Sequence, residues 1–366
     1  MKVAIVNCFD TYEIRVEPLI DYFSNNGDIV KVIQSDYMHI KKKRITKRLI
    51  NREYIHVKAY KKNFSLSRLY SHWCFSKDAV RAVNKFAPDL LYVLIPPNSM
   101  TKKMANYKRN NSNVKLIFDV IDLWPETMPI KKFKNVFPFS CWKKLRDKYI
   151  DEADYIITEC DLYHEYLNVD KNKIHTIYFA KNKPKLNRKI DLDDTNISLC
   201  YLGSINNIID IDSIGNIIRE ISKIKPVILK IIGDGEKKDK LIDVAKKSGA
   251  QVIDYGKIYD ENKKQDIFDT CHYGLNIYKD STIIGLTMKS IDYFSAGLPI
   301  INNIGGDTSE IVKKYNCGIN YILFNNISNY IINDNSKMRE STDKAFLDLF
   351  SMESTIKKIK EILSNI

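Results

Sequence analysis

No run of apolar residues in this chain of 366 residues approaches the roughly 18 that a membrane-spanning helix requires. The opening residues, MKVAIVNCF, also lack a charged stretch followed by a long apolar one, so they predict a first β-strand and not a signal peptide. Hydrophobic residues make up 44% of the sequence, which is enough to build cores. The length is too great for one compact domain and suits two.

Paired cysteines and metal-binding spacings are also missing. The sequence has no C-x-x-C pair, and its six histidines form no H-x3-H or HExxH spacing. Seven scattered cysteines, an odd number, argue against disulfides and structural zinc and favour a reducing cytoplasm. The glycine turn IIGDGE at 231–236 has Lys238 where a G-x-G-x-x-G fingerprint would need its last glycine. We therefore expect no metal site, no bound cofactor and no dinucleotide fold.

The excess of positive charge lies entirely in the first half of the chain. Residues 1–190 carry 36 basic and 20 acidic side chains, whereas residues 191–366 carry 22 and 25. Between Lys41 and Arg68 there are eleven basic residues and one acid, Glu53. Such an asymmetry indicates an anionic partner, either nucleic acid or a membrane surface.

Strand and helix signals alternate along both halves. In the first half, short apolar runs at 2–8, 29–35, 89–95, 114–120, 153–158 and 174–179 predict strands separated by helices. Residues 181–196 are polar and without a period, as expected of a linker. The alternation restarts at 197, and residues 336–366 read as helix throughout. The pattern predicts an α/β fold with two domains, 1–180 and 197–345, each with a parallel sheet.

The stretch 281–307 says most about function. An apolar run ends at Tyr278, and Thr287 is placed to cap a helix that Gly297 would end. A helix N-terminus at the carboxyl edge of a parallel sheet is a site for phosphates. Lys289 in its first turn adds a cation, and Asp292 lies three residues on. A cation for a diphosphate and a carboxylate for a ribose suit a sugar nucleotide.

The segment TMKSIDYFSAGLPII resembles the donor-site signature of family 4 retaining glycosyltransferases, in particular the bacterial polysaccharide-assembly branch. The residues that fall on the pattern are Lys289, Asp292, Tyr293, Ser295, Gly297, Pro299, Ile300 and Ile301. Two positions depart from it: Asp292 stands where the family usually has Glu, and Ile284 replaces the first of two carboxylates, the one usually ascribed to the sugar ring.

The resemblance implies the GT-B architecture, in which two Rossmann-like domains face each other. A C-terminal helix, here at about 346–366, then crosses back to the first domain. It also implies a metal-independent transferase that uses a nucleotide-diphosphate sugar as donor substrate and needs no cofactor, since enzymes of this fold stabilise the leaving diphosphate with helix dipoles and cations.

Further donor-site residues follow three strands of the second half. The turns concerned contain Gly203 and Ser204, then Gly233 and Asp234, then Tyr255 and Gly256. A small-residue turn lets backbone N–H groups approach a phosphate, and the resemblance places the last two turns near the nucleotide and its base. Each turn also has a simpler interpretation as an ordinary connection between a strand and a helix.

The run IDLWPET at 121–127 resembles a segment of family members that extend lipid-linked glycans. Asp122 would orient an acceptor hydroxyl or stabilise charge at the sugar carbon. Asp122 and Lys289 are therefore our two candidate catalytic residues. Glu126 and His39 are further acceptor-side candidates. The alternative for IDLWPET is a helix cap with a packed tryptophan.

Basic and aromatic residues of the first half predict contact with an anionic membrane surface. The residues that we assign to it are Lys41, Lys42, Lys43, Arg44 and, from the interleaved segment 129–149, Phe137, Phe139 and Trp142. Each basic residue near such a surface contributes about 1 kcal/mol. The aromatic residues are alternatively core. Nucleic acid is not expected, because no recognised binding module accompanies the charge.

Together these observations predict a cytoplasmic glycosyltransferase, peripheral on the inner face of the plasma membrane. It would transfer a sugar with retention to a polyprenyl-diphosphate-linked glycan during capsule, O-antigen or exopolysaccharide synthesis. Two alternatives stay open: a sugar-nucleotide epimerase of the same fold, and a non-catalytic protein that binds sugar nucleotides or membranes. The sequence does not specify the sugar or the nucleotide.

Overall fold

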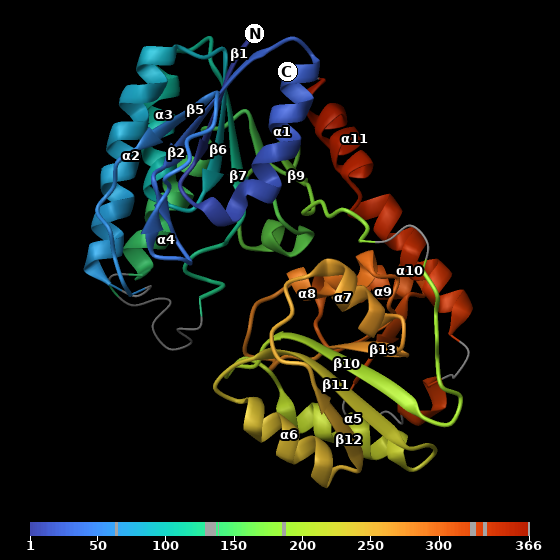
Figure 1. Ribbon diagram of the computed structural model, residues 1–366. Helices are drawn as coiled ribbons and strands as arrows, with labels where there is room; N and C mark the ends of the chain where they lie inside the picture. Colours follow the sequence, from blue (N-terminus) through green and yellow to red (C-terminus); the bar gives the residue numbers. More distant parts are fainter. Residues whose placement is uncertain are drawn as a thin grey trace. The chain divides into compact units, whose positions relative to one another are not determined.

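The computed structural model describes residues 1–62, 65–128, 137, 139–184, 188–322, 327–331 and 335–364 (Figure 1). The contacts of the chain divide it into two compact units. Unit 1 comprises Met1–Ala180 and Thr355–Ile366, and unit 2 comprises Lys181–Ser354. The chain therefore passes from one unit to the other twice.

Unit 1 is built on a seven-stranded sheet in which every pairing is parallel. In spatial order its strands are β5 (Arg52–Ile55), β2 (Ile29–Ser35), β1 (Lys2–Asn7), β6 (Leu90–Ile95), β7 (Lys115–Val120), β8 (Tyr155–Thr158) and β9 (Ile174–Thr176). A short antiparallel pair, β3 (Tyr37–Met38) and β4 (Lys43–Arg44), lies between β2 and β5 in sequence. The central strands are apolar because both faces of the sheet are covered, and all six residues of β6 are buried.

Helices cover both faces of this sheet (Figure 1). The helix α1 (Glu13–Asn25) lies on one face, while α2 (Leu66–Phe86), α3 (Ser99–Asn110) and α4 (Phe139–Ile150) pack side by side on the other. The short helices η1 (Asp10–Tyr12) and η2 (Asp161–Glu165) follow β1 and β8. The Ser65 side chain caps α2 by accepting from the Arg68 N–H at 3.3 Å.

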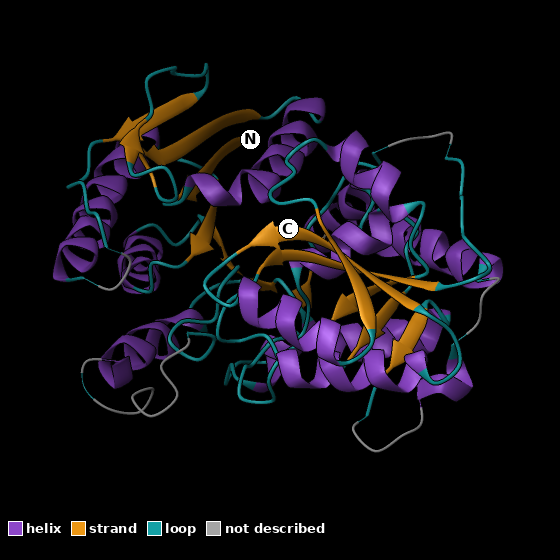
Figure 2. Cartoon of the chain, turned by 60° about the horizontal axis from the view of Figure 1, so that its bottom comes forward, coloured by secondary structure: helices purple, strands orange, loops and turns teal. Residues whose placement is uncertain are grey.

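Unit 2 repeats the topology with six parallel strands (Figure 2). Their spatial order is β12 (Ala250–Asp254), β11 (Val227–Asp234), β10 (Ile197–Ser204), β13 (Tyr273–Asn276), β14 (Ile300–Asn302) and β15 (Gly318–Asn320). The helices are α5 (Ile211–Ser222), α6 (Lys238–Lys247), α7 (Glu261–Phe268), α8 (Met288–Ser295), α9 (Gly306–Tyr315) and α10 (Ser336–Leu349), with η3 (Ile327–Tyr330) before α10. Leucine, isoleucine and tyrosine side chains of β10, β11, α5 and their neighbours form the core.

The order of strands reverses direction once in each sheet, between β1 and β6 in unit 1 and between β10 and β13 in unit 2. In open α/β sheets, ligands bind outside the carboxyl ends of the strands at such a switch point. The residues that follow β1, β10 and β13 are therefore the first places to look for a functional site.

The structure confirms the predicted α/β fold with two parallel-sheet halves and corrects its last element. The predicted helix at 336–366 is two helices, α10 and α11 (Met352–Leu363), which belong largely to different units.

Gly233 provides a test of how tightly the edge of the second sheet is built. A Cβ atom there would lie 2.0 Å from the carbonyl oxygen of Gly203. Gly233→Ala is expected to destabilise unit 2 by about 3 kcal/mol, because the clash is with backbone that cannot move aside. Urea unfolding measures the effect.

Gly256→Ala is the matched control, since Gly256 has φ +65° but a Cβ atom there would meet no other atom within 4 Å. It is expected to cost only about 1 kcal/mol, the strain of a left-handed alanine. Equal losses in the two variants would contradict the close approach of Gly203 and Gly233.

Candidate functional site

Three glycine turns line the carboxyl edge of the second sheet. Gly203 and Gly233 are paired in register at the ends of β10 and β11, and Gly233 N donates to Gly256 O at 2.7 Å. Gly203 has φ +105°, a conformation that L side chains rarely adopt. The structure thus brings together the three turns that the sequence analysis singled out, in the order of their strands.

Lys289, in the first turn of α8, is buried against this edge with only 8% of its surface exposed. Its ammonium lies 4.1 Å from the ring centroid of Tyr201 and 4.8 Å from that of Tyr278. Among the described residues, Nζ has no hydrogen-bond partner. Burial lowers the pKa of this ammonium to about 7. A buried ammonium between two aromatic faces, with no anionic partner in the part of the chain that the structure describes, is placed to receive an anion.

The position of α8 is fixed by Tyr293, which lies one turn after Lys289. Its hydroxyl accepts from Leu202 N at 2.8 Å and donates to Cys200 O at 3.0 Å, and so it joins α8 to β10. Gly274 makes room for the ring, because a Cβ there would lie 2.8 Å from it. Thr287 caps α8 as predicted, since its hydroxyl accepts from Ser290 N at 3.0 Å.

Two other predicted donor-site side chains, Asp292 and Asp234, pair with lysines of unit 2. Asp292 forms an ion pair with Lys181, which also lies 3.2 Å from Glu261. Asp234 is exposed and pairs with Lys257 at 3.0 Å. Tyr255 is 41% exposed. Lys289 and Asp292 therefore make different contacts, and Asp292 must release Lys181, or share it, before it can bind a ribose.

A cavity of about 220 Å³ adjoins Lys289 through Tyr278. It lies at the carboxyl ends of β13 and β14, next to the N-terminus of α9. The lining residues are Tyr278, Lys279, Asp280, Thr282, Ile284, Asn303, Ile304 and Gly305. The loop that carries Ile284 is held in place, because Gly285 O accepts from both the N–H and the hydroxyl of Thr308, at 2.8 and 2.7 Å. Ile284 is thus part of a defined wall and cannot contribute the charge of a carboxylate.

In unit 1, Asp122 lies beyond the end of β7. The hydroxyl of Tyr12 donates to its carboxylate at 2.5 Å. Burial raises the pKa of Asp122, while the Tyr12 hydrogen bond and the charge of Arg68 oppose the rise. The carboxylate is therefore held in one orientation by a residue of η1, the short helix that follows β1.

Aromatic and imidazole rings surround Arg68 on the inner face of α2. Its guanidinium lies 4.5 Å from the Trp124 ring centroid, and its Nε donates to His72 at 3.3 Å. His39 is hydrogen-bonded to the Tyr60 hydroxyl at 2.7 Å. Burial, together with the charge of Arg68, lowers the pKa of both histidines, to about 4 for His39. Both imidazoles are neutral at physiological pH and accept or donate hydrogen bonds without adding charge.

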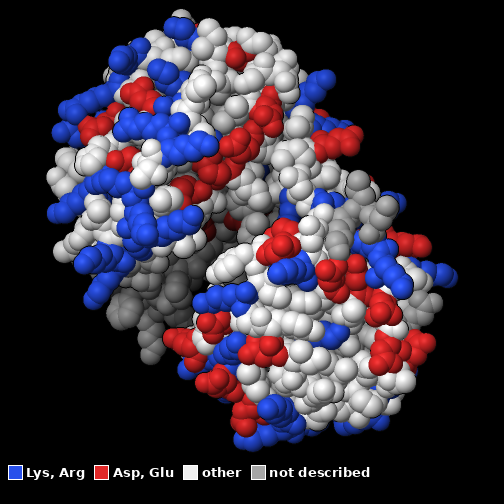
Figure 3. All heavy atoms as spheres, in the orientation of Figure 1, with Lys and Arg blue, Asp and Glu red and all other residues white. Residues whose placement is uncertain are grey.

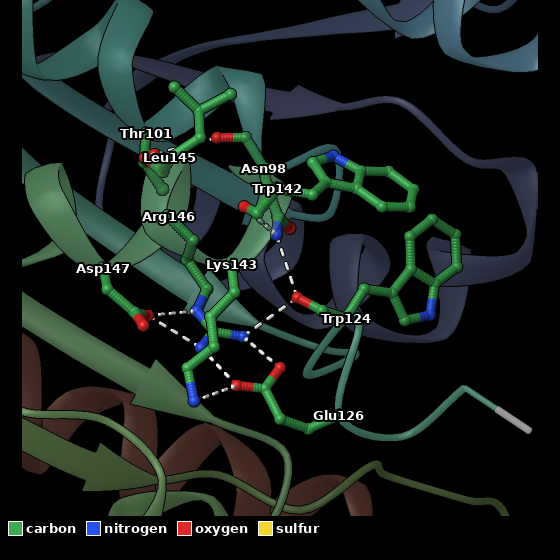
Figure 4. A network of polar contacts seen from close by, with 9 residues as sticks. All are labelled: Asn98, Thr101, Trp124, Glu126, Trp142, Lys143, Leu145, Arg146 and Asp147. Atoms are coloured by element: carbon green, nitrogen blue, oxygen red, sulfur yellow. Dashed lines mark hydrogen bonds and ion pairs between the residues drawn. The ribbon is translucent and has the colours of Figure 1, made fainter. Parts of the chain in front are cut away.

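Glu126, an acceptor-side candidate, contacts basic residues of α4. Its carboxylate accepts from both Arg146 Nη atoms, at 3.0 and 2.8 Å, and lies 3.1 Å from Lys143 Nζ (Figure 4). Arg146 is fully buried and also donates to Trp124 O at 3.0 Å. Burial acts to raise the pKa of Glu126, but Arg146 and Lys143 outweigh it and hold the pKa below its usual range. In unit 1, this pair anchors the IDLWPET loop to α4.

Asn98 completes this anchor (Figure 4). Its side-chain amide donates to Trp124 O at 2.9 Å and to Trp142 O at 3.1 Å. Trp142, predicted to contact a membrane, is half-buried, and its ring centroid lies 5.7 Å from that of Trp124. For Trp142 the core alternative of the sequence analysis describes its observed packing better.

The other predicted membrane residues differ in their contacts. Lys42 lies 4.6 Å from the Tyr60 ring centroid, and Arg44 pairs with Asp36 at 2.6 Å. Lys41 and Lys43 are exposed, Phe137 is 78% exposed and Phe139 is half-buried. Residues 129–136 and 138 of the interleaved segment lie outside the described residues. No described helix is both long and apolar enough to cross a bilayer.

Several residues of the site had no signal in the sequence. Tyr201 and Tyr278 lie in apolar runs of the sequence, where a tyrosine looks like a core residue. Arg68 and His72 lie in a part of the sequence where the hydrophobic residues show no clear period. A spacing of four between Arg68 and His72 is the one pattern that places them on a common helix face.

The fold is shared with solved structures of low sequence identity. Sucrose-phosphate synthase (tll1590) from Thermosynechococcus elongatus has a TM-score of 0.71 and 12% identity over 100% of this chain and 98% of that one. Anabaena Alr3699/HepE in complex with UDP has a TM-score of 0.69 and 13% identity over 100% of both chains. The lipopolysaccharide outer core galactosyltransferase WaaB, in its apo form, has a TM-score of 0.66 and 12% identity over 100% and 99%. No protein-family model matches the sequence, and no curated protein matches it either.

The contribution of Glu126 to holding the IDLWPET loop can be tested by measuring the stability of a Glu126 variant. Glu126→Gln is expected to cost about 2 kcal/mol at pH 7, because the buried Arg146 then keeps only one of its two acidic partners, Asp147 at 2.7 Å. The pKa of Glu126 is lowered in the folded state, so its contribution is present above about pH 4.5 and is lost as the pH falls further. The difference between variant and parent, measured by urea unfolding, should therefore stay constant from pH 7 to about pH 5 and shrink as the pH falls below about 4.5.

Glu152→Gln is the control, because Glu152 forms a more exposed pair with Arg109. Its loss should cost less than about 1 kcal/mol. A Glu126 variant as stable as this control would show that the pair does not hold the loop.

Proposed function

We propose that this protein is a glycosyltransferase that moves a sugar from a nucleotide-diphosphate sugar to a hydroxyl of an acceptor. The observation that carries the proposal is Lys289, whose buried ammonium has no anionic partner among the described residues. It lies at the start of α8, beside the switch point of the second sheet, where both the helix dipole and free N–H groups favour an anion.

The donor would occupy the carboxyl edge of the second sheet. Its diphosphate would contact Lys289 and the backbone at Gly203 and Ser204, and its nucleoside would extend along the turns of Gly233 and Gly256. The glycosyl group would then enter the cavity beside Tyr278 and Ile284. In support, the relatives in fold include Anabaena HepE, whose structures contain UDP and UDP-glucose.

The chemistry would be a retaining, metal-independent transfer. As the bond between the sugar and the diphosphate breaks, negative charge grows on the leaving oxygen, and the ammonium of Lys289 stabilises it most at that moment. Tyr12 holds the carboxylate of Asp122 in place to orient the acceptor hydroxyl. Transfer with retention lets a donor phosphate oxygen accept the proton of the incoming hydroxyl.

We assign the acceptor to the class of polyprenyl-diphosphate-linked glycans and the setting to bacterial capsule, O-antigen or exopolysaccharide synthesis at the cytoplasmic face of the inner membrane. The basic excess of residues 1–190 supports an acceptor with an anionic, membrane-bound carrier. One of the similar structures is described as a lipopolysaccharide outer core galactosyltransferase.

The two alternatives predict different reactions. An epimerase would convert the donor to a new sugar nucleotide without any acceptor, and a non-catalytic protein would bind the donor without turnover. A transferase releases a nucleoside diphosphate in proportion to the glycan that it extends. Chromatography of the donor after incubation, with and without acceptor, separates the three.

Removing Lys289 tests the placement of the diphosphate. In a thermal-shift panel of nucleoside diphosphates and sugar nucleotides, a ligand at 100 times its Kd should stabilise the parent by about 2.7 kcal/mol. Lys289→Met should abolish this stabilisation. The melting temperature without ligand should not fall, because a buried ammonium without a partner is lost.

Lys246→Met is the matched control, since Lys246 is exposed on α6. It should keep the full ligand-induced shift. If Lys289→Met also keeps it, the diphosphate does not bind at α8.

Donor binding should depend on pH. The pKa of Lys289 is about 7 without ligand, so at pH 8 most of the ammonium groups are neutral and must take up a proton to pair with a diphosphate. The neighbouring Tyr201 and Tyr278 do not titrate in this range, because burial raises the pKa of both. The Kd of a sugar nucleotide is expected to rise about tenfold from pH 6 to pH 8.

Calorimetry in buffers of different ionisation enthalpy should show uptake of nearly one proton on binding at pH 8 and little at pH 6. A sugar nucleotide is the suitable probe, because its esterified diphosphate keeps a constant charge over this range. A pH-independent Kd without proton uptake would mean that Lys289 is already charged or makes no contact with the ligand.

A further inference from the structure

The outward face of the first half of α2 carries an apolar stripe. Leu66, Leu69, Tyr70 and Trp73 follow the spacing of residues on one side of a helix, and Leu66, Tyr70 and Trp73 are 84%, 51% and 48% exposed. The opposite side of α2 is buried against the sheet. In a soluble domain the outward side is usually polar, so a stripe of large apolar side chains there is a candidate contact surface.

Lysines flank the aromatic members of the stripe. The rings of Tyr70 and Trp73 stack with centroids 5.9 Å apart and planes 25° apart. Lys58 Nζ lies 5.4 Å from the Tyr70 centroid, and Lys77 Nζ lies 5.6 Å from that of Trp73. Each ammonium thus lies over an exposed aromatic ring. Charged groups beside large apolar side chains are typical of a boundary between water and an apolar phase.

The stripe continues into the basic stretch at 41–62. Arg44 donates to Val57 O at 3.0 Å, which brings β4 beside the segment that carries Lys58. Lys41, Lys43, Lys61 and Lys62 are exposed. Between His39 and Lys77 the sequence contains one acid, Glu53, which lies 3.5 Å from Lys31. Figure 3 shows Lys and Arg side chains gathered on the left side of the view, over the part of unit 1 where Figure 1 places α2.

We propose that this surface, the α2 face (Leu66, Leu69, Tyr70 and Trp73 with Lys58 and Lys77), binds an anionic lipid bilayer. Tyr70, Trp73 and the leucines enter the headgroup region, while the lysines contact lipid phosphates. A second copy of the chain does not fit, because an isologous contact would bring two strongly basic surfaces together. The inference specifies the membrane contact within the proposed function, and it concerns residues other than Phe137, Phe139 and Trp142.

The test is co-sedimentation with vesicles of phosphatidylcholine alone or mixed with phosphatidylglycerol. The parent should bind the mixed vesicles, dissociate from them when salt is added, and bind the neutral vesicles only weakly. Lys58→Gln/Lys77→Gln should weaken binding about thirtyfold, the effect of two lysines at the surface. Tyr70→Ser/Trp73→Ser should weaken it at least tenfold at unchanged charge.

Two matched variants in unit 2 are the controls. Ile224→Ser/Tyr259→Ser replaces side chains that are 56% and 84% exposed, and Lys246→Gln/Lys263→Gln removes two exposed lysines. Both should bind vesicles like the parent. Melting temperatures and the nucleotide-induced thermal shift of all variants establish that they are folded and that the donor site is intact.

Three outcomes would overturn the proposal: no binding of the parent to anionic vesicles, equal losses in the α2-face and control variants, or loss of a parent dimer in Tyr70→Ser/Trp73→Ser without an effect on vesicles. The last would assign the face to self-association. None of these results bears on donor binding, which the Lys289 variant tests separately.

Discussion

The buried ammonium of Lys289 is the interaction on which the proposed donor site depends. A cation that lies between two tyrosine rings has lost water and gained only the weak attraction of the rings. Its pKa of about 7 expresses this imbalance. Tyr293 fixes α8 on β10, Thr287 caps its first turn, and Gly203 leaves the edge open beside the lysine. The fold holds Lys289 in a position that an anion would make favourable.

The candidate sites of the two units differ in the types of residue that form them. In both units the candidate residues lie near the point where the strand order of the parallel sheet reverses. In unit 2 the candidate residues are glycine backbone and the buried Lys289, which suit a diphosphate. In unit 1 they are aromatic rings, neutral histidines, Arg68 and the carboxylate of Asp122, which Tyr12 holds. Such a surface suits a hydroxylated ring, whose apolar face stacks on aromatic residues and whose hydroxyls bond to neutral groups.

Local patterns were enough to predict the parts of the site that are local. The cap at Thr287, the end of α8 before Gly297 and the turns at Gly203 and Gly233 follow from residue type and spacing, and the structure has them. The partner of Asp292 did not follow, because Lys181 is 111 residues away. Likewise Glu126 is chemically able to meet an acceptor, and only the fold shows that Arg146 engages it. In the first half of α2 the outward side is also apolar, which hides the helical period in the sequence.

The C-terminal segment joins the two units in a way that bears on how the chain is made. Residues up to Ala180 contain all seven strands of the first sheet, yet unit 1 also includes Thr355–Ile366. During synthesis the first sheet emerges from the ribosome long before these last residues do. The surface of unit 1 that contacts α11 therefore stays uncovered until unit 2 has been translated. Folding of unit 1 is complete only after residues 355–366 have been synthesised.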